Sequence, residues 1–221
     1  RYSDRQSDAA EYDETAAEAG VGYRPASGNR LDLVARYADG EYPNRNAAVL
    51  ASGYTQRDLR LQGKWQPTGH SRLSGYVAMT RRTYSGNDRL DFTGPIGRLV
   101  YDWEPTGKLA LRTTVRRELG SQDEVIDNFV ISRAITVEPR WTVTSKVTAW
   151  GTAQWLKRDL GQNLQTVSND AQTRSYGLGL TYQPRPSIVL TSAYLHARRT
   201  ANQPQLEYTD DIVRLDLSVG F

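Results

Sequence analysis

The chain has 221 residues and a formal net charge of +3, from 28 basic and 25 acidic residues, without a dense basic run, which argues against nucleic-acid binding. It contains no Cys, which excludes disulfides, thiolate metal sites and a cysteine nucleophile. Mean hydropathy is -0.64 and no apolar run approaches the roughly 18 residues of a membrane helix, but a membrane β-barrel needs only about ten alternating residues per strand.

Alternation of apolar and polar residues predicts eleven long strands. The first is expected over 14–24, because Ala19, Val21 and Tyr23 alternate with polar or small residues. A short helix over 14–19 is the competing interpretation, since Glu and Ala favour helices. The other ten strands are expected over 31–38, 54–66, 71–84, 90–104, 108–119, 127–138, 141–156, 173–183, 187–199 and 206–221.

The strand expected over 127–138 alternates less clearly than the others. Arg133 has the same parity as Ile131 and Ile135, so a charge falls on the apolar face. A β-bulge or a wrong strand boundary would explain this irregularity.

A short signature recurs five times along the chain: an aromatic or apolar residue, one polar residue and then Pro. It ends at Pro25, Pro67, Pro105, Pro139 and Pro184. The spacing of 34 to 45 residues suits two strands, one tight turn and one longer loop. Pro ends a strand and presets φ of a type I turn, and the Gly that follows is expected to be left-handed.

The remaining connections are longer and rich in Asn, Asp, Gly and Gln. They are expected at 39–46, 85–89, 120–127, 157–172 and 200–205. Short turns at one end and long polar loops at the other are typical of outer-membrane barrels. A WD40-type propeller also repeats at about 40 residues, but it needs four short strands per repeat.

Aromatic side chains precede the short turns at a common strand depth. Such rings form belts at a membrane–water interface. The predicted membrane-interface aromatics are Tyr23, Trp65, Trp103, Tyr182 and Phe221, and an opposite belt is expected to contain Tyr37, Tyr84 and Trp155.

The last strand is apolar at every second position and ends on Phe221. A terminal Phe on an amphipathic strand resembles the signal that the bacterial barrel-assembly machinery reads, so this machinery and the lipid bilayer are expected partners. The short turns lie on the side of this end, which places them in the periplasm.

Together these patterns predict an all-β protein, an antiparallel up-and-down transmembrane β-barrel of about 11–12 strands. We expect a single outer-membrane domain over residues 1–221 in which residues 1–13 are the remnant of a preceding strand or loop. Barrels with both ends in the periplasm need an even number of strands, so we expect the chain to be N-terminally incomplete. The start at Arg1, without a signal peptide, also indicates a processed or truncated chain.

The polar face of the strands is expected to line the lumen. Its predicted basic residues, which would form a transport path, are Arg36, Arg60, Lys64, Arg82, Arg98, Arg112, Arg116, Lys146, Arg198 and Arg214. The expected inward acids are Asp32, Asp102, Glu104, Glu118 and Asp216. Excess guanidinium groups would favour anionic polymers, whereas pairing across strands would only hold the wall.

Three further aromatic side chains have lumen parity, namely Tyr76, Trp150 and Tyr194. Aromatic faces stack on sugar rings, so these residues are candidate polysaccharide contacts. Filling of gaps inside the barrel is the alternative.

The stretch from Leu90 to Lys108, LDFTGPIGRLVYDWEPTGK, together with Asn29-Arg-Leu-Asp-Leu and Asp39-Gly-Glu-Tyr42, resembles the EpsL-type outer-membrane β-barrel of exosortase-associated exopolysaccharide biosynthesis loci. The resemblance covers about residues 20–221. It implies a pore for export of an extracellular polysaccharide from a Gram-negative cell, with periplasmic export partners.

Two other functions stay open: a general diffusion porin or small-solute channel, and a structural scaffold whose loops bind a partner. An enzyme is not expected. The chain has only His70 and His196, and nothing arranges them with a nucleophile such as Ser192. No catalytic residue, metal site or cofactor is predicted.

Overall fold

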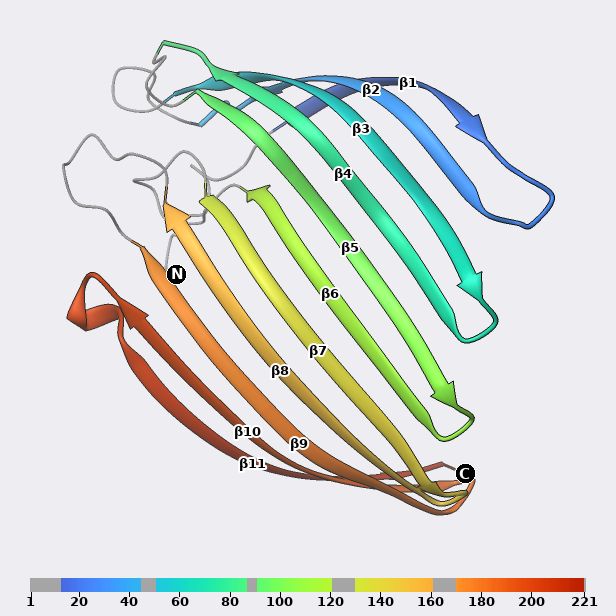
Figure 1. Cartoon of the computed structure of the whole chain (residues 1–221). Coiled ribbons are helices and arrows are strands. Elements are labelled where there is room, and N and C mark those ends of the chain that lie inside the picture. Colours follow the sequence, from blue (N-terminus) through green and yellow to red (C-terminus); the bar gives the residue numbers. More distant parts are fainter. Residues whose placement is uncertain (1–12, 45–50, 87–90, 121–129, 161–169, 221) are drawn as a thin grey trace.

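A computed structural model describes residues 13–44, 51–86, 91–120, 130–160 and 170–220, and these residues form one antiparallel sheet of eleven strands (Figure 1). Each strand pairs with its neighbours in the sequence. The strands are β1 Asp13–Tyr23, β2 Arg30–Glu41, β3 Gly53–Thr68, β4 Ser71–Tyr84, β5 Phe92–Thr106, β6 Leu109–Gly120, β7 Val130–Thr144, β8 Val147–Leu160, β9 Ala171–Arg185, β10 Ile188–Ala201 and β11 Tyr208–Val219, with a short 3-10 helix at Pro204–Leu206.

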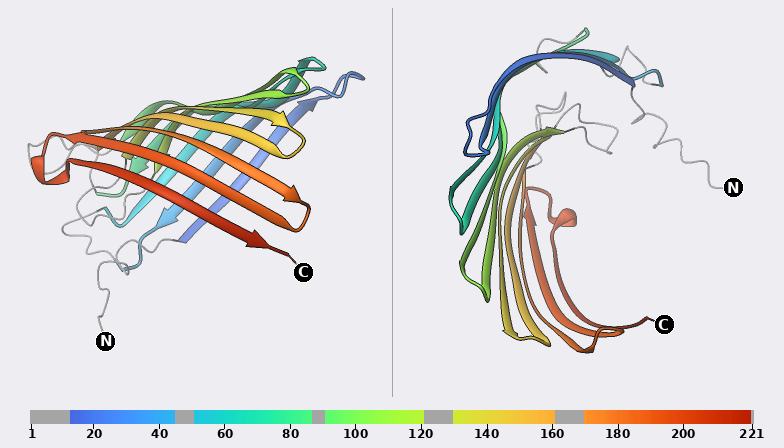
Figure 2. Two further views of the ribbon diagram at one scale, coloured as in Figure 1. Left: turned by 90° about the horizontal axis from the view of Figure 1, so that it is seen from below. Right: turned by 90° about the vertical axis from the view of Figure 1, so that its right-hand side faces the viewer.

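The sheet curves into a trough whose two edges are β1 and β11 (Figure 2). All eleven predicted strands are present, so the predicted up-and-down architecture is confirmed. The first of them is a strand and not a helix, because β1 pairs with β2 along its whole length. Among the described residues, no helix is long and apolar enough to cross a membrane.

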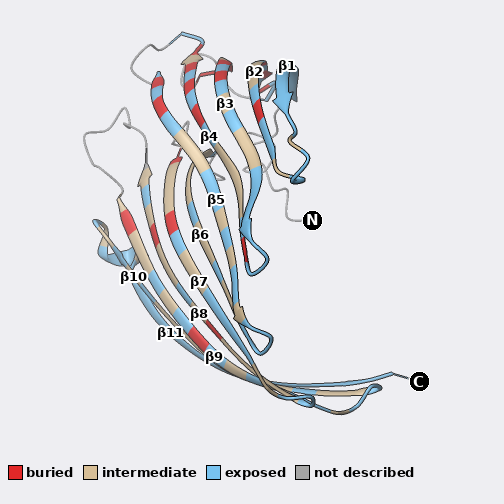
Figure 3. Cartoon of the chain, turned by 45° about the vertical axis from the view of Figure 1, so that its right-hand side comes forward, coloured by how far each residue is buried: buried red, intermediate tan, exposed pale blue. Residues whose placement is uncertain are grey.

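The two faces of the sheet differ in chemistry and in burial. Buried residues alternate with more exposed ones along β2 to β4 (Figure 3). On β2 to β4 the polar face is buried, and Asp32, Asp58 and Thr80 are each at most 6% exposed. The apolar face is open, with Leu33 44% and Met79 54% exposed. Side chains converge on the concave side of a curved sheet and diverge on its convex side. The polar face is therefore concave, and the apolar face is convex.

The short turns differ in detail from the prediction. Pro67, Pro105 and Pro184 lie inside their strands, where the pairing register shifts, one residue before the strand ends. Pro139 does not end a strand at all, since β7 continues to Thr144. A Pro can occupy a bulge or a position where the ladder is interrupted, because no N–H is needed there.

Threonine, and not glycine, shapes three of these turns. The Oγ1 atoms of Thr68, Thr106 and Thr144 accept bonds of 3.2 to 3.3 Å from the backbone N–H two residues later. The expected left-handed Gly is wrong for Gly69 and Gly107, since the positive-φ glycines among the described residues are Gly28, Gly75 and Gly86. A hydroxyl that bonds its own backbone stabilises a tight turn without a special φ.

A small aromatic cluster closes the concave face at the long-loop end. Tyr42, Tyr54, Tyr84 and Phe92 are each at most 6% exposed and pack together. The prediction that Tyr84 belongs to an outer aromatic belt is therefore wrong. Its even parity in β4 matches that of buried Thr80, so it points to the concave side.

Candidate functional site: the concave wall

Eight of the ten predicted lumen cations lie on the concave face, as the strand register places them: Arg36, Arg60, Lys64, Arg82, Arg98, Arg112, Arg116 and Arg214. The expected acids Asp32, Asp102, Glu118 and Asp216 share this face by the same register. Glu104 has the same parity but lies at the register shift next to a turn.

Two of the ten cations are misplaced by the prediction. Lys146 lies in the turn between β7 and β8, outside either strand. Arg198 pairs with Arg174, which shares the convex face with Leu178 and Leu180. The concave side of β9 and β10 carries small residues such as Gly177 and Ala193, so polarity alone does not identify the lumen face there.

Several concave arginines are paired with carboxylates. Arg112 Nε lies 2.7 Å from Asp102 Oδ1, and Arg116 Nη1 lies 3.3 Å from Glu118 Oε2. Arg214 Nε lies 2.7 Å from Asp216 Oδ2. The Arg112–Asp102 pair joins β6 to β5 and helps to hold these two strands in register, whereas the other two pairs each join residues two apart on one strand. Among the described residues, Arg98 and Lys64 are exposed and form no ion pair, so they are open to an anion; Arg140 and Arg158 on the same face form no ion pair either.

The strongest network surrounds Asp58, whose side chain is fully buried. Its carboxylate accepts bonds from Gln56 Nε2 at 2.8 Å and Thr80 Oγ1 at 2.6 Å. Arg36 Nη1 lies 3.5 Å away and also pairs with Glu14 and Glu18. The network joins β1 to β4 and is a structural element of the wall.

A hollow of about 470 Å³ lies further towards the short turns, against β5 to β8. The concave side chains around it include Trp150, Arg112, Arg140, Asp102 and Glu138. The Trp150 ring lies against Gly179 of β9: a Cβ on Gly179 would come within 2.3 Å of the ring. A flat aromatic ring flanked by guanidinium and carboxylate groups is a surface on which a sugar can stack and form hydrogen bonds.

The two other candidate sugar contacts lie on opposite faces. Tyr76 is concave, and the Arg60 guanidinium lies 5.0 Å from its ring centroid. Tyr194 is convex, because it pairs with Leu178. The prediction of lumen parity for Tyr194 is wrong for the same reason as that for Arg198.

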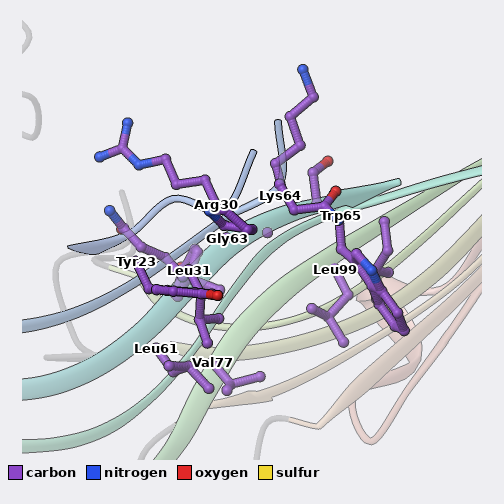
Figure 4. Close-up of a pocket in the computed structure, with 16 residues that line it drawn as sticks. Tyr23, Arg30, Leu31, Leu61, Gly63, Lys64, Trp65, Val77 and Leu99 are labelled. Carbon is purple, nitrogen blue, oxygen red and sulfur yellow. The ribbon is translucent and has the colours of Figure 1, made fainter. Parts of the chain in front are cut away.

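The convex face carries the apolar surface. A groove of about 480 Å³ on this face is lined by side chains such as Leu61, Trp65, Val77 and Leu99 (Figure 4). In this view Lys64 points to the opposite side of the sheet from these residues. Tyr23, Trp65, Trp103 and Tyr182 are 41% to 68% exposed at the short-turn end, and Phe221 lies outside the described residues. Trp141, 50% exposed next to the turn at Ser145, joins this row and was missed because Pro139 marked the wrong turn.

A hydrolase site does not form around His196. Its Nδ1 lies 2.8 Å from Asp211 Oδ1, and its ring stacks on Tyr176 on the convex face. Ser192 lies four residues along the same strand, which is about 13 Å at the rise of an extended chain. No group of three or more His, Cys, Asp or Glu within the described part of the chain could hold a metal ion.

A match to a protein family identifies the class of protein to which the chain belongs. The family described as "Putative beta-barrel porin 2" matches residues 73–221, about two thirds of the chain. The chain belongs to this family. No curated protein sequence matches the chain.

Solved structures with the same fold are outer-membrane receptors and transporters. The FrpB iron transporter of Neisseria meningitidis superposes with a TM-score of 0.63 at 13% identity, over 95% of this chain and 41% of that chain. A mutant ferric enterobactin receptor, PfeA of Pseudomonas aeruginosa, gives 0.55 at 12% identity, over 94% and 40%. The chain thus spans about two fifths of these structures, and the likeness concerns the fold alone.

The family and the fold place this protein in the bacterial outer membrane as a porin-like β-barrel. The concave wall is then the side that faces the lumen, and the convex face is the side that contacts lipid.

Proposed function

We propose that this barrel is a non-enzymatic pore for export of an extracellular polysaccharide. The observation that carries the proposal is the hollow at Trp150, where an aromatic ring and two arginines face the lumen. The open cations Arg98 and Lys64 add positive charge along the same wall. Rings of basic side chains favour anionic solutes, so an acidic polysaccharide is the expected substrate. Periplasmic export partners and assembly through the Phe221 strand are parts of the same proposal.

The first test is conductance of the refolded protein in a planar bilayer, with sodium alginate as the anionic polysaccharide. Export predicts that alginate added on the short-turn side blocks the current reversibly, while uncharged dextran of equal size blocks it much less. Equal blocking by both polymers would indicate a general diffusion porin. A bilayer without conductance would leave only the scaffold function and would exclude both pore functions.

Replacing Trp150 by Ala removes the stacking surface, and we expect it to weaken alginate blocking about tenfold. Trp155→Ala is the matched control, since Trp155 lies on the same strand but on the opposite face. We expect alginate to block this control variant as strongly as it blocks the wild type. A loss of equal size in both variants would contradict a sugar contact at Trp150.

Ion selectivity tests the role of the basic side chains separately from that of Trp150. The double variant Arg98→Ser and Lys64→Ser is expected to lower the anion-to-cation permeability ratio, because these two cations have no carboxylate partner. Reversal potentials in a salt gradient measure this ratio. An unchanged ratio would show that the two side chains do not line the conduction path.

A further inference from the structure

The convex face carries a row of basic side chains at the long-loop end of the sheet. We name it the basic belt, and its members are Arg57, Arg81, Arg117, Arg133, Lys157, Arg174 and Arg198. Each lies three or four residues from the long-loop end of its strand. Their regular height, repeated over seven strands, indicates a single function for the row.

The members of the basic belt face one another directly. Four cross-strand pairs are formed: Arg57 with Arg81, Arg117 with Arg133, Arg133 with Lys157, and Arg174 with Arg198. Like charges directly opposite one another destabilise a sheet. An anion that bridges them would remove this cost.

The protein itself neutralises only part of the basic belt. Asp159 lies 3.0 Å from Arg133 and 2.9 Å from Lys157. Arg57, Arg81 and Arg198 form no ion pair with any described residue. Arg174 is held by its neighbour instead, since the Gln172 side-chain oxygen, when oriented towards it, accepts from Arg174 Nε at 2.7 Å.

The belt marks one boundary of the apolar surface. One pleat closer to the short turns, the convex side chains are Leu59, Met79, Val115, Ile135 and Trp155 on five of these strands, and Tyr176 and His196 on β9 and β10. At the other boundary of the described sheet, a row of aromatic side chains takes the place of the arginines: Tyr23, Trp65, Trp103, Trp141 and Tyr182. Charged side chains on a lipid-facing strand are tolerated only near the interface, where their cost falls to about zero.

We infer that the basic belt binds the phosphate groups of a phosphorylated glycolipid, of the lipid A type, in the outer leaflet. A guanidinium group binds phosphate through two parallel hydrogen bonds, so Arg is the side chain best suited to this ligand. The asymmetry of the two boundaries matches a membrane whose outer leaflet alone is densely anionic. Acyl chains would then lie along the apolar groove formed by Pro95, Val115 and Ile135 beside Arg117 and Arg133.

The test is binding of lipid A to the purified protein in detergent, followed by native mass spectrometry. The variant R57Q/R81Q/R174Q/R198Q removes four unneutralised charges, and we expect at least a tenfold loss of affinity, since each basic residue near an anionic surface contributes about fivefold. R98Q/R116Q is the matched control. It removes a directly opposed arginine pair from the concave face and should bind lipid A within about twofold of the wild type.

Two further ligands separate the sources of negative charge. Dephosphorylated lipid A and phosphatidylglycerol should each bind at least tenfold more weakly than lipid A. The inference would be overturned if dephosphorylated lipid A or phosphatidylglycerol bound as tightly as lipid A. It would also be overturned if the quadruple variant bound lipid A as tightly as the wild type, or if the concave control lost as much affinity as the quadruple variant. Heat-modifiable migration on gels confirms folding, and if the quadruple variant does not fold, R57Q/R81Q and R174Q/R198Q are each tested alone, with a threefold loss or more expected.

Discussion

Replacing Gly75 by Ala is expected to lower the free energy of unfolding by about 3 kcal/mol or more. Gly75 has a φ of +140°, which side chains rarely adopt. A Cβ at this position would lie 1.9 Å from the carbonyl oxygen of Arg98 on β5. That atom is backbone and cannot move away without breaking the ladder between the two strands. The measurement is thermal unfolding in detergent, followed by loss of heat-modifiable migration.

Gly107→Ala is the control for the change of residue type. Gly107 lies in a turn, its φ is not positive, and an added Cβ would meet nothing within 4 Å. We expect its effect to stay within about 0.5 kcal/mol. Equal melting temperatures for the two variants would show that β4 and β5 can separate locally at no cost.

Much of this fold could be predicted because a membrane barrel repeats one rule. Every strand alternates between water and lipid, so parity alone gives both the strands and the faces of most of their residues. The predicted boundaries are less accurate where a Pro marks the expected end of a strand. Pro139 has the same local signature as Pro105, yet β7 continues past it for five residues. The feature that recurs in three of these turns is instead a Thr whose hydroxyl accepts a hydrogen bond from the backbone N–H two residues later.

The residues of the candidate site were predicted less accurately than the strands. The concave position of Arg112 follows from alternation, but its carboxylate partner Asp102 lies on another strand and depends on the register between strands, which the sequence does not state. A bulge or a wrong strand boundary was the expected explanation for the parity of Arg133. The structure has no bulge there, because β6 and β7 pair without a shift around it, whereas the boundary does differ, since β7 spans Val130–Thr144. The exception to alternation was a functional candidate: Arg133 belongs to the basic belt.

The buried carboxylate of Asp58 provides a second test of the wall. Removing it in Asp58→Ala leaves Gln56 Nε2 and Thr80 Oγ1 without their acceptor and Arg36 without one of its three acids. Buried polar groups that lose a partner cost about 1–3 kcal/mol each. Because Arg36 keeps Glu14 and Glu18, we expect a total loss of about 2–4 kcal/mol of unfolding free energy.

Asp102→Ala is the matched control. It tests whether the burial of an ion pair or its short distance determines how much the pair contributes to stability. Asp102 lies only 2.7 Å from Arg112, closer than Asp58 lies to Arg36, but the two side chains are 26% and 59% exposed. Exposed pairs contribute about 0–1 kcal/mol, so this variant should unfold close to the wild-type temperature. Destabilisation by Asp102→Ala equal to that by Asp58→Ala would mean that the wall is held by all its ion pairs alike. The expected inequality would assign its stability to the dry network between β1 and β4, and would leave the wetter pairs near Trp150 free to exchange partners with a passing solute.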